Sequence, residues 1–187
     1  FERQQPRPAP QERGAPQADA GAVFRLIERV HGLPDDWQDR ALKLGADVPA
    51  CVRSEMSVGR GVGEELAPLE NDLAGAPVLL VNPRVALSTG PVFKAWDQED
   101  RGALPEGSAR AVAMQGRNDL EAPAVSICPV IADVLAALRE TAPMLARMSG
   151  SGATCFALYD SVEARDCAAN AIAAHQPGWW RMASVLR

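Results

Sequence analysis

Three short segments of this 187-residue chain combine residue types that can handle a phosphate group or an alcohol. The first is Leu-Gly-Ala-Asp-Val-Pro, which ends at Pro49 and places Asp47 on a constrained turn between apolar neighbours. The second is Ser-Gly-Ser-Gly-Ala-Thr, residues 149–154, in which closely spaced glycines permit positive φ angles and can turn successive N–H groups toward one point. The third, residues 87–93, has the hydroxyl and proline pattern of a helix start, where backbone N–H groups are unpaired.

Each segment has a chemical interpretation and an ordinary structural one. Asp47 could accept a proton as a general base, or it could simply cap a turn. The loop at 149–154 could hold a phosphate, or it could connect two hairpin strands. The helix start could hold an anionic or hydroxyl-bearing ligand, or it could be well capped and nothing more. Local sequence by itself leaves all three pairs open.

The spacing of apolar residues predicts an α+β chain that would position these segments. Residues 1–17 contain four prolines and few large apolar side chains, which predicts a disordered lead-in with order beginning near Asp19. We expect helices over 19–31 and 37–44, a short helix from Ser88, one helix from about Ser126 to Leu138 and another over 161–174, with strands over 78–81, 154–159 and 179–186. In the second half this order is typical of a ferredoxin-like sandwich.

Composition excludes few classes. The net charge of −5 argues against a nucleic-acid partner, since phosphate backbones attract clustered Lys and Arg. The longest apolar runs are far shorter than the ~20 residues of a membrane helix, so we predict no membrane segment. No metal-ligand spacing is visible, which predicts no metal site formed by the cysteines. The cysteines have apolar neighbours, which predicts buried reduced thiols and a cytoplasmic location; they are Cys51, Cys128, Cys155 and Cys167.

Taken together and in order, the segments resemble the GHMP kinase superfamily, most closely its methylerythritol branch. The resemblance covers about residues 18–187. Its matching segments are Ala18–Ile27, Leu44–Pro49, Gly61–Glu64, Leu79–Pro83, Ser88–Phe93, Asn118–Glu121 and Met148–Leu158. The combination of LGADVP with SGSGATCF is sharper than the general superfamily pattern.

The resemblance implies a fold and a reaction. Residues 76–187 would form the superfamily's C-terminal ferredoxin-like α/β sandwich, and residues 18–75 a remnant of its N-terminal, ATP-binding and catalytic domain. The reaction would be ATP-dependent phosphorylation of the 2-hydroxyl of 4-diphosphocytidyl-2-C-methyl-D-erythritol, in the non-mevalonate route to isoprenoid precursors. The implied cofactors are ATP and Mg²⁺, and the partner is a small cytidine diphosphate substrate.

The resemblance also implies a role for individual residues. Asp47 would be the catalytic base. The substrate side of the cleft would include Thr89 and Phe93. The nucleotide side would be the loop of Gly150, Ser151 and Gly152, which supports the phosphate-binding loop. We expect the segments Gly61–Glu64 and Asn118–Glu121 to be structural.

One stretch departs from the family pattern. Where the family has a glycine-rich phosphate loop, residues 11–17 retain one glycine, and Pro16 has no N–H to offer. We also expect the upstream strands of the N-terminal part to be missing. A second interpretation therefore stays open, a non-catalytic kinase-derived remnant that acts as an interaction module, with the apolar side of helix 19–31 covered by a partner or in a homodimer. A third, a mevalonate- or homoserine-type kinase, is disfavoured by LGADVP and by Asn118–Glu121.

Overall fold

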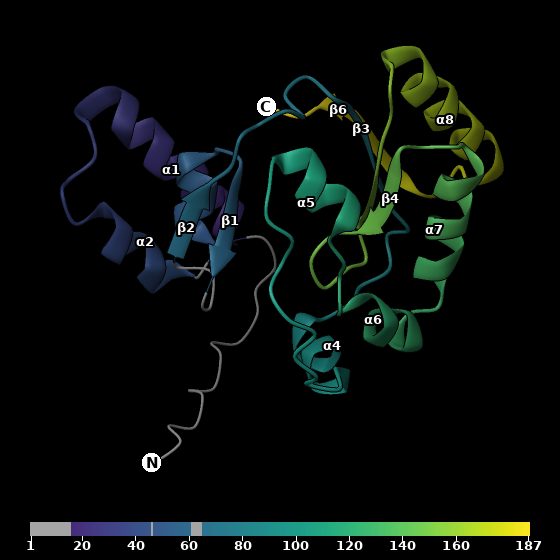
Figure 1. Cartoon of the computed structure of the whole chain (residues 1–187), viewed down its shortest axis with the longest axis horizontal. Coiled ribbons are helices and arrows are strands. Elements are labelled where there is room, and N and C mark those ends of the chain that lie inside the picture. Colours follow the sequence, from purple (N-terminus) through teal and green to yellow (C-terminus); the bar gives the residue numbers. More distant parts are fainter. Residues whose placement is uncertain (1–15, 46, 61–64) are drawn as a thin grey trace. The chain divides into compact units, whose positions relative to one another are not determined.

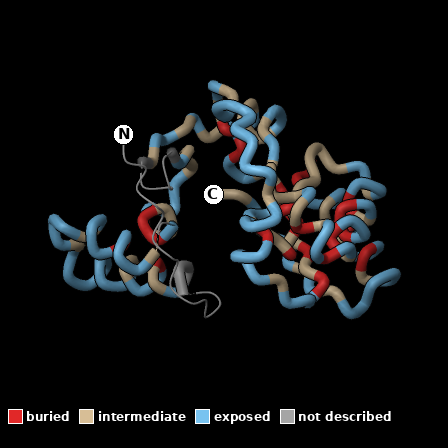
Figure 2. Tube along the Cα trace, turned by 90° about the horizontal axis from the view of Figure 1, so that it is seen from below, coloured by how far each residue is buried: buried red, intermediate tan, exposed pale blue. Residues whose placement is uncertain are grey.

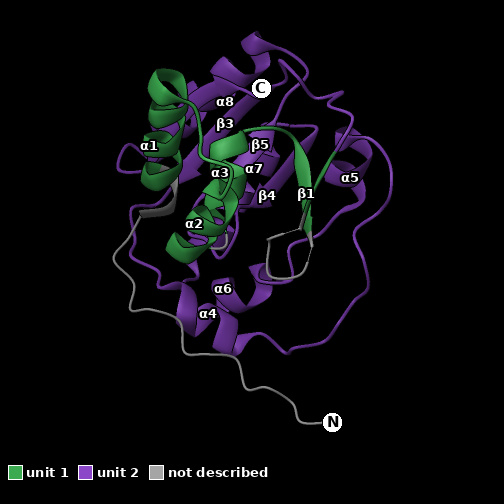
Figure 3. Cartoon of the chain, turned by 90° about the vertical axis from the view of Figure 1, so that its left-hand side faces the viewer, with its two compact units in different colours: residues 1–68 green, residues 69–187 purple. Residues whose placement is uncertain are grey.

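The computed structural model describes residues 16–45, 47–60 and 65–187 (Figure 1). The chain divides into two compact units, of which the first ends at Pro68 and the second runs from Leu69 to Arg187 (Figure 3). The predicted lead-in falls mainly outside the described residues, as do the predicted Gly61–Glu64 match and Ala46.

The division lies seven residues before the boundary that we predicted at 75/76. Residues 69–76 belong with the second unit because they are hydrogen-bonded to it. The side chain of Asn71 donates to the carbonyl oxygen of Arg187 at 2.7 Å, and the Gly75 amide donates to that of Leu186 at 2.9 Å. The Ser108 hydroxyl donates to Asp72 at 2.6 Å.

The first unit is mostly helical. Its elements are α1 (Pro16–His31), α2 (Trp37–Leu44), α3 (Val48–Arg53), β1 (Ser57–Arg60) and β2 (Glu65–Pro68). Helix α1 begins three residues before the predicted Asp19 and ends where expected, because Gly32 adopts a φ of +76° just after it. Strands β1 and β2 pair antiparallel.

Close helix packing builds the small core of this unit. Helices α1 and α3 approach at Gly21, where an added Cβ would lie 2.5 Å from the Cβ of Cys51, so only glycine permits this contact. The buried side chains are Ala41, Val48 and Val52, with Phe24 and Trp37 packed against them. The short apolar run Ala50–Val52 lies in α3.

The second unit is a four-stranded antiparallel sheet with helices. Its elements are β3 (Pro77–Asn82), α4 (Thr89–Ala95), α5 (Ala109–Gln115), α6 (Glu121–Ile127), α7 (Val130–Glu140), β4 (Leu145–Met148), β5 (Cys155–Leu158), α8 (Val162–His175) and β6 (Trp180–Val185). The strand order is β4-β5-β3-β6, and every pairing is antiparallel. This order, with α7 and α8 as the two crossover helices, confirms the predicted ferredoxin-like sandwich.

The core of the second unit lies between the sheet and helices α7 and α8, where the buried residues gather (Figures 1 and 2). Leu79 and Val81 point into it from the central strand β3, as the period of two in a strand requires. Helix α7 contributes the apolar stripe that the sequence predicted, of which Ile131, Val134, Leu135 and Leu138 are buried.

Two predictions about this unit, and one about the cysteines of the whole chain, were wrong or incomplete. The single helix from Ser126 is two helices, because Pro129 lacks the N–H that would continue the first one. Helix α5 and the short edge strand β4 were not predicted. Cys128 and Cys155 are buried, but Cys51 is only partly buried and Cys167 is exposed, so the expectation of four buried thiols fails at Cys167; all four thiols are free.

Candidate active site

The Ser-Gly-Ser-Gly-Ala-Thr segment is the connection of the β4–β5 hairpin. Met148 and Cys155 pair at its base, and the Ser149 amide donates to the Thr154 carbonyl oxygen at 2.9 Å. A second bond turns the loop, in which the Gly152 amide donates to the Ser149 carbonyl oxygen at 3.0 Å. Within the part of the chain that the structure describes, the amides of the two residues between, 150 and 151, have no hydrogen-bond partner.

The two glycines of the loop differ in what they do. Both have a positive φ, +54° at Gly150 and +90° at Gly152. A Cβ at Gly150 would meet nothing within 4 Å, whereas one at Gly152 would lie 2.9 Å from Sδ of Met148 and 3.2 Å from Cδ2 of Leu87. Gly152 therefore bends the loop and lets it pack closely against Met148 and Leu87. Its amide is already hydrogen-bonded within the loop. The amides of Gly150 and Ser151, in contrast, are available to a ligand.

Side chains at the start of α6 and just before it hold this loop. The side-chain amide of Asn118 donates to the carbonyl oxygens of Met148 at 2.9 Å and Gly150 at 2.8 Å. A carboxylate oxygen of Glu121 accepts the Met148 amide at 3.4 Å, and its other oxygen lies 3.5 Å from Arg139. The sequence match at Asn118–Glu121 pointed to this segment, but sequence reasoning assigned it no part in the site.

Helix α4 contacts the same loop. The hydroxyl oxygens of Thr89, the first residue of α4, and Ser151 lie 2.9 Å apart. Phe93 follows Thr89 by one helical turn, and its side chain is 51% exposed. The structure thus brings two of the predicted segments together, the helix start and the Gly/Ser loop. The half-exposed ring of Phe93 lies one helical turn after the Thr89–Ser151 contact.

Asp47 lies in the first unit, directly before α3. Its side chain is exposed and makes no capping bond, although its carbonyl oxygen accepts the Cys51 amide. Burial, and after it the negative charge of Asp47, raises the pKa of the Cys51 thiol, while Arg25 acts in the opposite direction. Because Asp47 belongs to one unit and the loop to the other, their convergence on one cleft stays a prediction.

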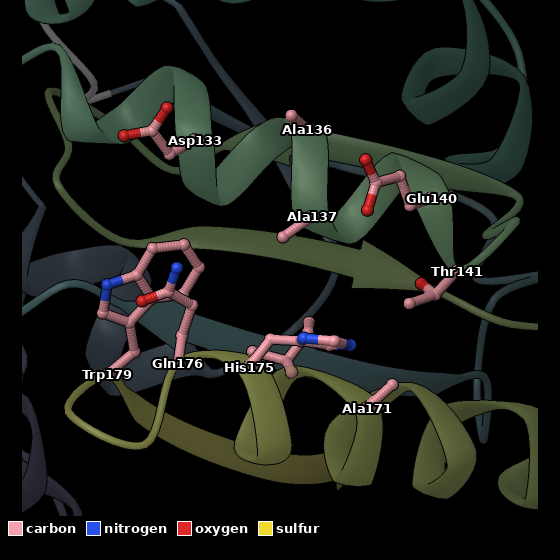
Figure 4. A pocket seen from close by; sticks show the side chains of 10 residues that line it. Asp133, Ala136, Ala137, Glu140, Thr141, Ala171, His175, Gln176 and Trp179 are labelled. Carbon is pink, nitrogen blue, oxygen red and sulfur yellow. The ribbon is translucent and has the colours of Figure 1, made fainter.

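The second unit contains two sizeable cavities, and none of the predicted site residues lines either one. A cavity of about 460 Å³ opens between α7 and α8, where Asp133 and Glu140 face His175 and Trp179 across the groove (Figure 4). The other, about 410 Å³, is lined by Asn118 and by residues at the end of α4 and in α6: Ala95, Trp96, Asp97, Arg101, Asp119, Ala122, Pro123 and Ser126. Asn118 thus both lines this cavity and donates hydrogen bonds to the loop.

Neither a metal cluster nor a membrane span is found among the described residues. No three His, Cys, Asp or Glu side chains gather there as a metal site would need. Magnesium that travels with a nucleotide is held largely by phosphate oxygens and water with one or two carboxylates, so the exposed carboxylate of Asp47 is compatible with it. None of the described helices is both long and apolar enough to cross a membrane.

Comparison with known proteins shows which family this chain is similar to. Residues 102–177 match the family described as GHMP kinases C terminal. Over 93% of its length the chain is 64% identical to the 4-diphosphocytidyl-2-C-methyl-D-erythritol kinase of Erythrobacter litoralis, and equally to that of Novosphingobium aromaticivorans. The chain belongs to the GHMP kinase family.

Structural similarity leads to the same GHMP kinase branch. A crystal structure of 4-(cytidine 5'-diphospho)-2C-methyl-D-erythritol kinase superposes with a TM-score of 0.71 over 92% of this chain and 68% of that one, at 26% identity. The chain spans 65% of the Erythrobacter relative and 60% of the Novosphingobium relative. These relatives carry the name of the methylerythritol branch, as the sequence motifs predicted, and not that of a mevalonate- or homoserine-type kinase.

Proposed function

We propose that this GHMP kinase chain takes part in ATP-dependent phosphorylation of the 2-hydroxyl of 4-diphosphocytidyl-2-C-methyl-D-erythritol. The observation that carries the proposal is the loop at Ser149–Thr154, in which the amides of Gly150 and Ser151 have no hydrogen-bond partner among the described residues and the Ser151 hydroxyl contacts Thr89. Backbone amides at a bend of positive φ are well suited to phosphate oxygens. The names of the relatives at 64% identity support the choice of substrate.

In this proposal the chemistry needs little more than positioning and charge stabilisation. The substrate hydroxyl oxygen forms a bond to the γ-phosphorus of ATP, the bond to the ADP oxygen breaks, and the hydroxyl proton passes to the carboxylate of Asp47. That transfer requires the carboxylate within roughly 2.6–3.2 Å of the hydroxyl. Magnesium would accompany ATP and offset the charge of its phosphates.

The remaining assignments follow from the same proposal. Gly150 and Ser151 would face the nucleotide, Gly152 would shape their loop, and Thr89 with Phe93 would lie on the substrate side. The first unit would be a remnant of the N-terminal catalytic domain, with Asp47 as its contribution. We expect a small-molecule substrate, no nucleic-acid partner and a cytoplasmic location, and a homodimer is compatible with the exposed face of α1.

A coupled assay of ADP release tests the proposal. The purified chain is given ATP, Mg²⁺ and the cytidyl alcohol, beside its Asp47→Asn and Asp39→Asn variants. Asp39 is an exposed acid on α2 and serves as the matched control. We expect turnover in the parent and in Asp39→Asn, and its loss in Asp47→Asn, since removing a general base costs on the order of 10²–10⁴-fold. Full activity of Asp47→Asn would refute the base assignment.

A second candidate function is a non-catalytic interaction module. One observation favours it, the apolar stripe on α1, where Val23, Leu26 and Val30 are 55%, 62% and 63% exposed. Exposed apolar patches of this kind mark protein interfaces. An inactive parent chain that sediments as a dimer, and that becomes monomeric in Leu26→Glu, would favour this candidate over the kinase. An active monomer would exclude it.

A further inference from the structure

The direction of a backbone N–H in the loop is fixed by the carbonyl group in the same peptide unit. In a planar trans peptide the C=O and N–H bonds point in opposite directions. The carbonyl of Gly150 points at Asn118, so the Ser151 N–H that shares its peptide plane points away from Asn118. The carbonyl of Ser149 accepts the Gly152 amide, so the Gly150 N–H points away from that bond.

Asn118 is the side chain that fixes the peptide plane between Gly150 and Ser151. Its NH₂ group has two hydrogens and uses one for each of two loop carbonyls, those of Met148 and Gly150. Its Oδ1 accepts the Leu120 amide at 3.0 Å, which holds the side chain in place. The Asn118 side chain is therefore fixed by a bond to its own backbone segment, and it holds the loop through two further hydrogen bonds.

We propose that Asn118 is a positioning residue, which turns the Ser151 amide outward to meet a phosphate oxygen of the nucleotide. Asn118 touches no reacting atom in this scheme and acts through the loop. The catalytic part of the proposal rests on the proposed function. The structural part, that the Gly150 peptide plane depends on Asn118, stands without it.

The chain offers a matched control in Asn71. Its side chain makes the same kind of bonds, since Oδ1 accepts the amide two residues on, at Leu73, and the NH₂ donates to a remote carbonyl, that of Arg187. Among the described residues, neither of these side-chain bonds reaches the loop or a predicted site residue. Asn→Asp at either position keeps the local acceptor and replaces the remote donor with an acceptor.

The experiment compares Asn118→Asp, Asn118→Ala and Asn71→Asp in the full chain. Hydrogen exchange reads the loop directly through the amides of Ser149 and Gly152, which are paired inside it. We expect exchange at both amides to rise about tenfold in the two Asn118 variants, as loss of a hydrogen-bonded restraint predicts, and to stay unchanged in Asn71→Asp. Asn118→Ala removes the donor without adding repulsion, so it covers the case in which Asn118→Asp does not fold.

Kinetics then separate a positioning role from a merely structural one. In the Asn118 variants we expect kcat/KM for ATP to fall about tenfold or more, while KM for the alcohol changes less than about twofold. Unchanged loop exchange in the Asn118 variants overturns the proposal, and so does raised exchange with unaltered use of ATP. A parent chain without turnover overturns the proposed function instead. The exchange result then decides by itself whether Asn118 holds the loop.

Discussion

The hydroxyl oxygens of Thr89 and Ser151 lie 2.9 Å apart, although 62 residues separate them in the sequence. This contact joins the first turn of α4 to the Gly/Ser loop, the two segments that were predicted to face substrate and nucleotide. It links the two sides of the proposed site within the second unit. We therefore expect a change in the conformation of the loop to alter the position of the first turn of α4.

Ser151→Ala tests the value of this link. Thr89 and Ser151 form an exposed bond, so we expect the free energy of unfolding to change by less than about 0.5 kcal/mol. Kinase activity should fall several-fold, because α4 and the loop lose their connection. Ser126→Ala is the control, since its hydroxyl bonds only the Pro123 carbonyl of its own helix. Equal activity in the two variants would show that the link has no catalytic value.

Gly152→Ala tests the packing of the loop. The new Cβ would meet Sδ of Met148 at 2.9 Å in a residue with a φ of +90°, so we expect a loss of about 3 kcal/mol in stability. Gly150→Ala adds a methyl group to open space at a φ of +54° and should cost only about 1 kcal/mol. Urea denaturation measures both. If Gly150→Ala lowered the free energy of unfolding as much as Gly152→Ala, close packing of Gly152 would not be the reason for its loss of stability.

The hydrogen-bonded pair of Thr141, which is partly buried, and Tyr159, which is buried, predicts an asymmetric result. The Thr141 hydroxyl donates to the Leu138 carbonyl at 2.6 Å, so the Tyr159 hydroxyl, 2.8 Å away, is the donor of their shared bond. Tyr159→Phe removes that one bond and should cost about 1 kcal/mol. Thr141→Val removes both and strands the tyrosine O–H in the core, so it should cost about 2–3 kcal/mol. Thermal unfolding decides, and the opposite order would show that Tyr159 is satisfied elsewhere.

Alkaline pH should weaken the second unit through Cys155. Burial, and after it the charge of Glu121, raises the pKa of this thiol from 9.0 to about 12. A group whose folded pKa is raised contributes stability in full below its unfolded pKa, and that contribution is lost as the pH rises through the folded value. We therefore expect the free energy of unfolding to fall between pH 9 and about 12.

Two cysteine variants check this alkaline slope. In Cys155→Ala the free energy of unfolding should decline less steeply with pH, because the buried thiol is gone. Burial also raises the pKa of Tyr159, so part of the slope should remain. Cys167→Ala removes an exposed thiol and should keep the parent slope. If Cys155→Ala also kept the parent slope, the buried thiol would not be its source.

The sequence by itself determined those features that depend on neighbours along the chain. The apolar spacing of residues 131–138 predicted the helix that α7 forms, and the helix expected over 19–31 ends where α1 ends, because periodicity and glycine conformation act within a few residues. The order of strands and helices was enough for the ferredoxin-like sandwich, and the motifs were enough for the family.

Only the tertiary structure decided what depends on distant residues meeting. It assigned residues 69–76 to the second unit through bonds to Leu186 and Arg187, and it added the edge strand β4. It also showed that Asn118 grips the loop from 30 and 32 residues away. Local sequence encodes which hydrogen bonds a side chain can make, but the fold chooses the partner, because that choice depends on the packing of the whole unit.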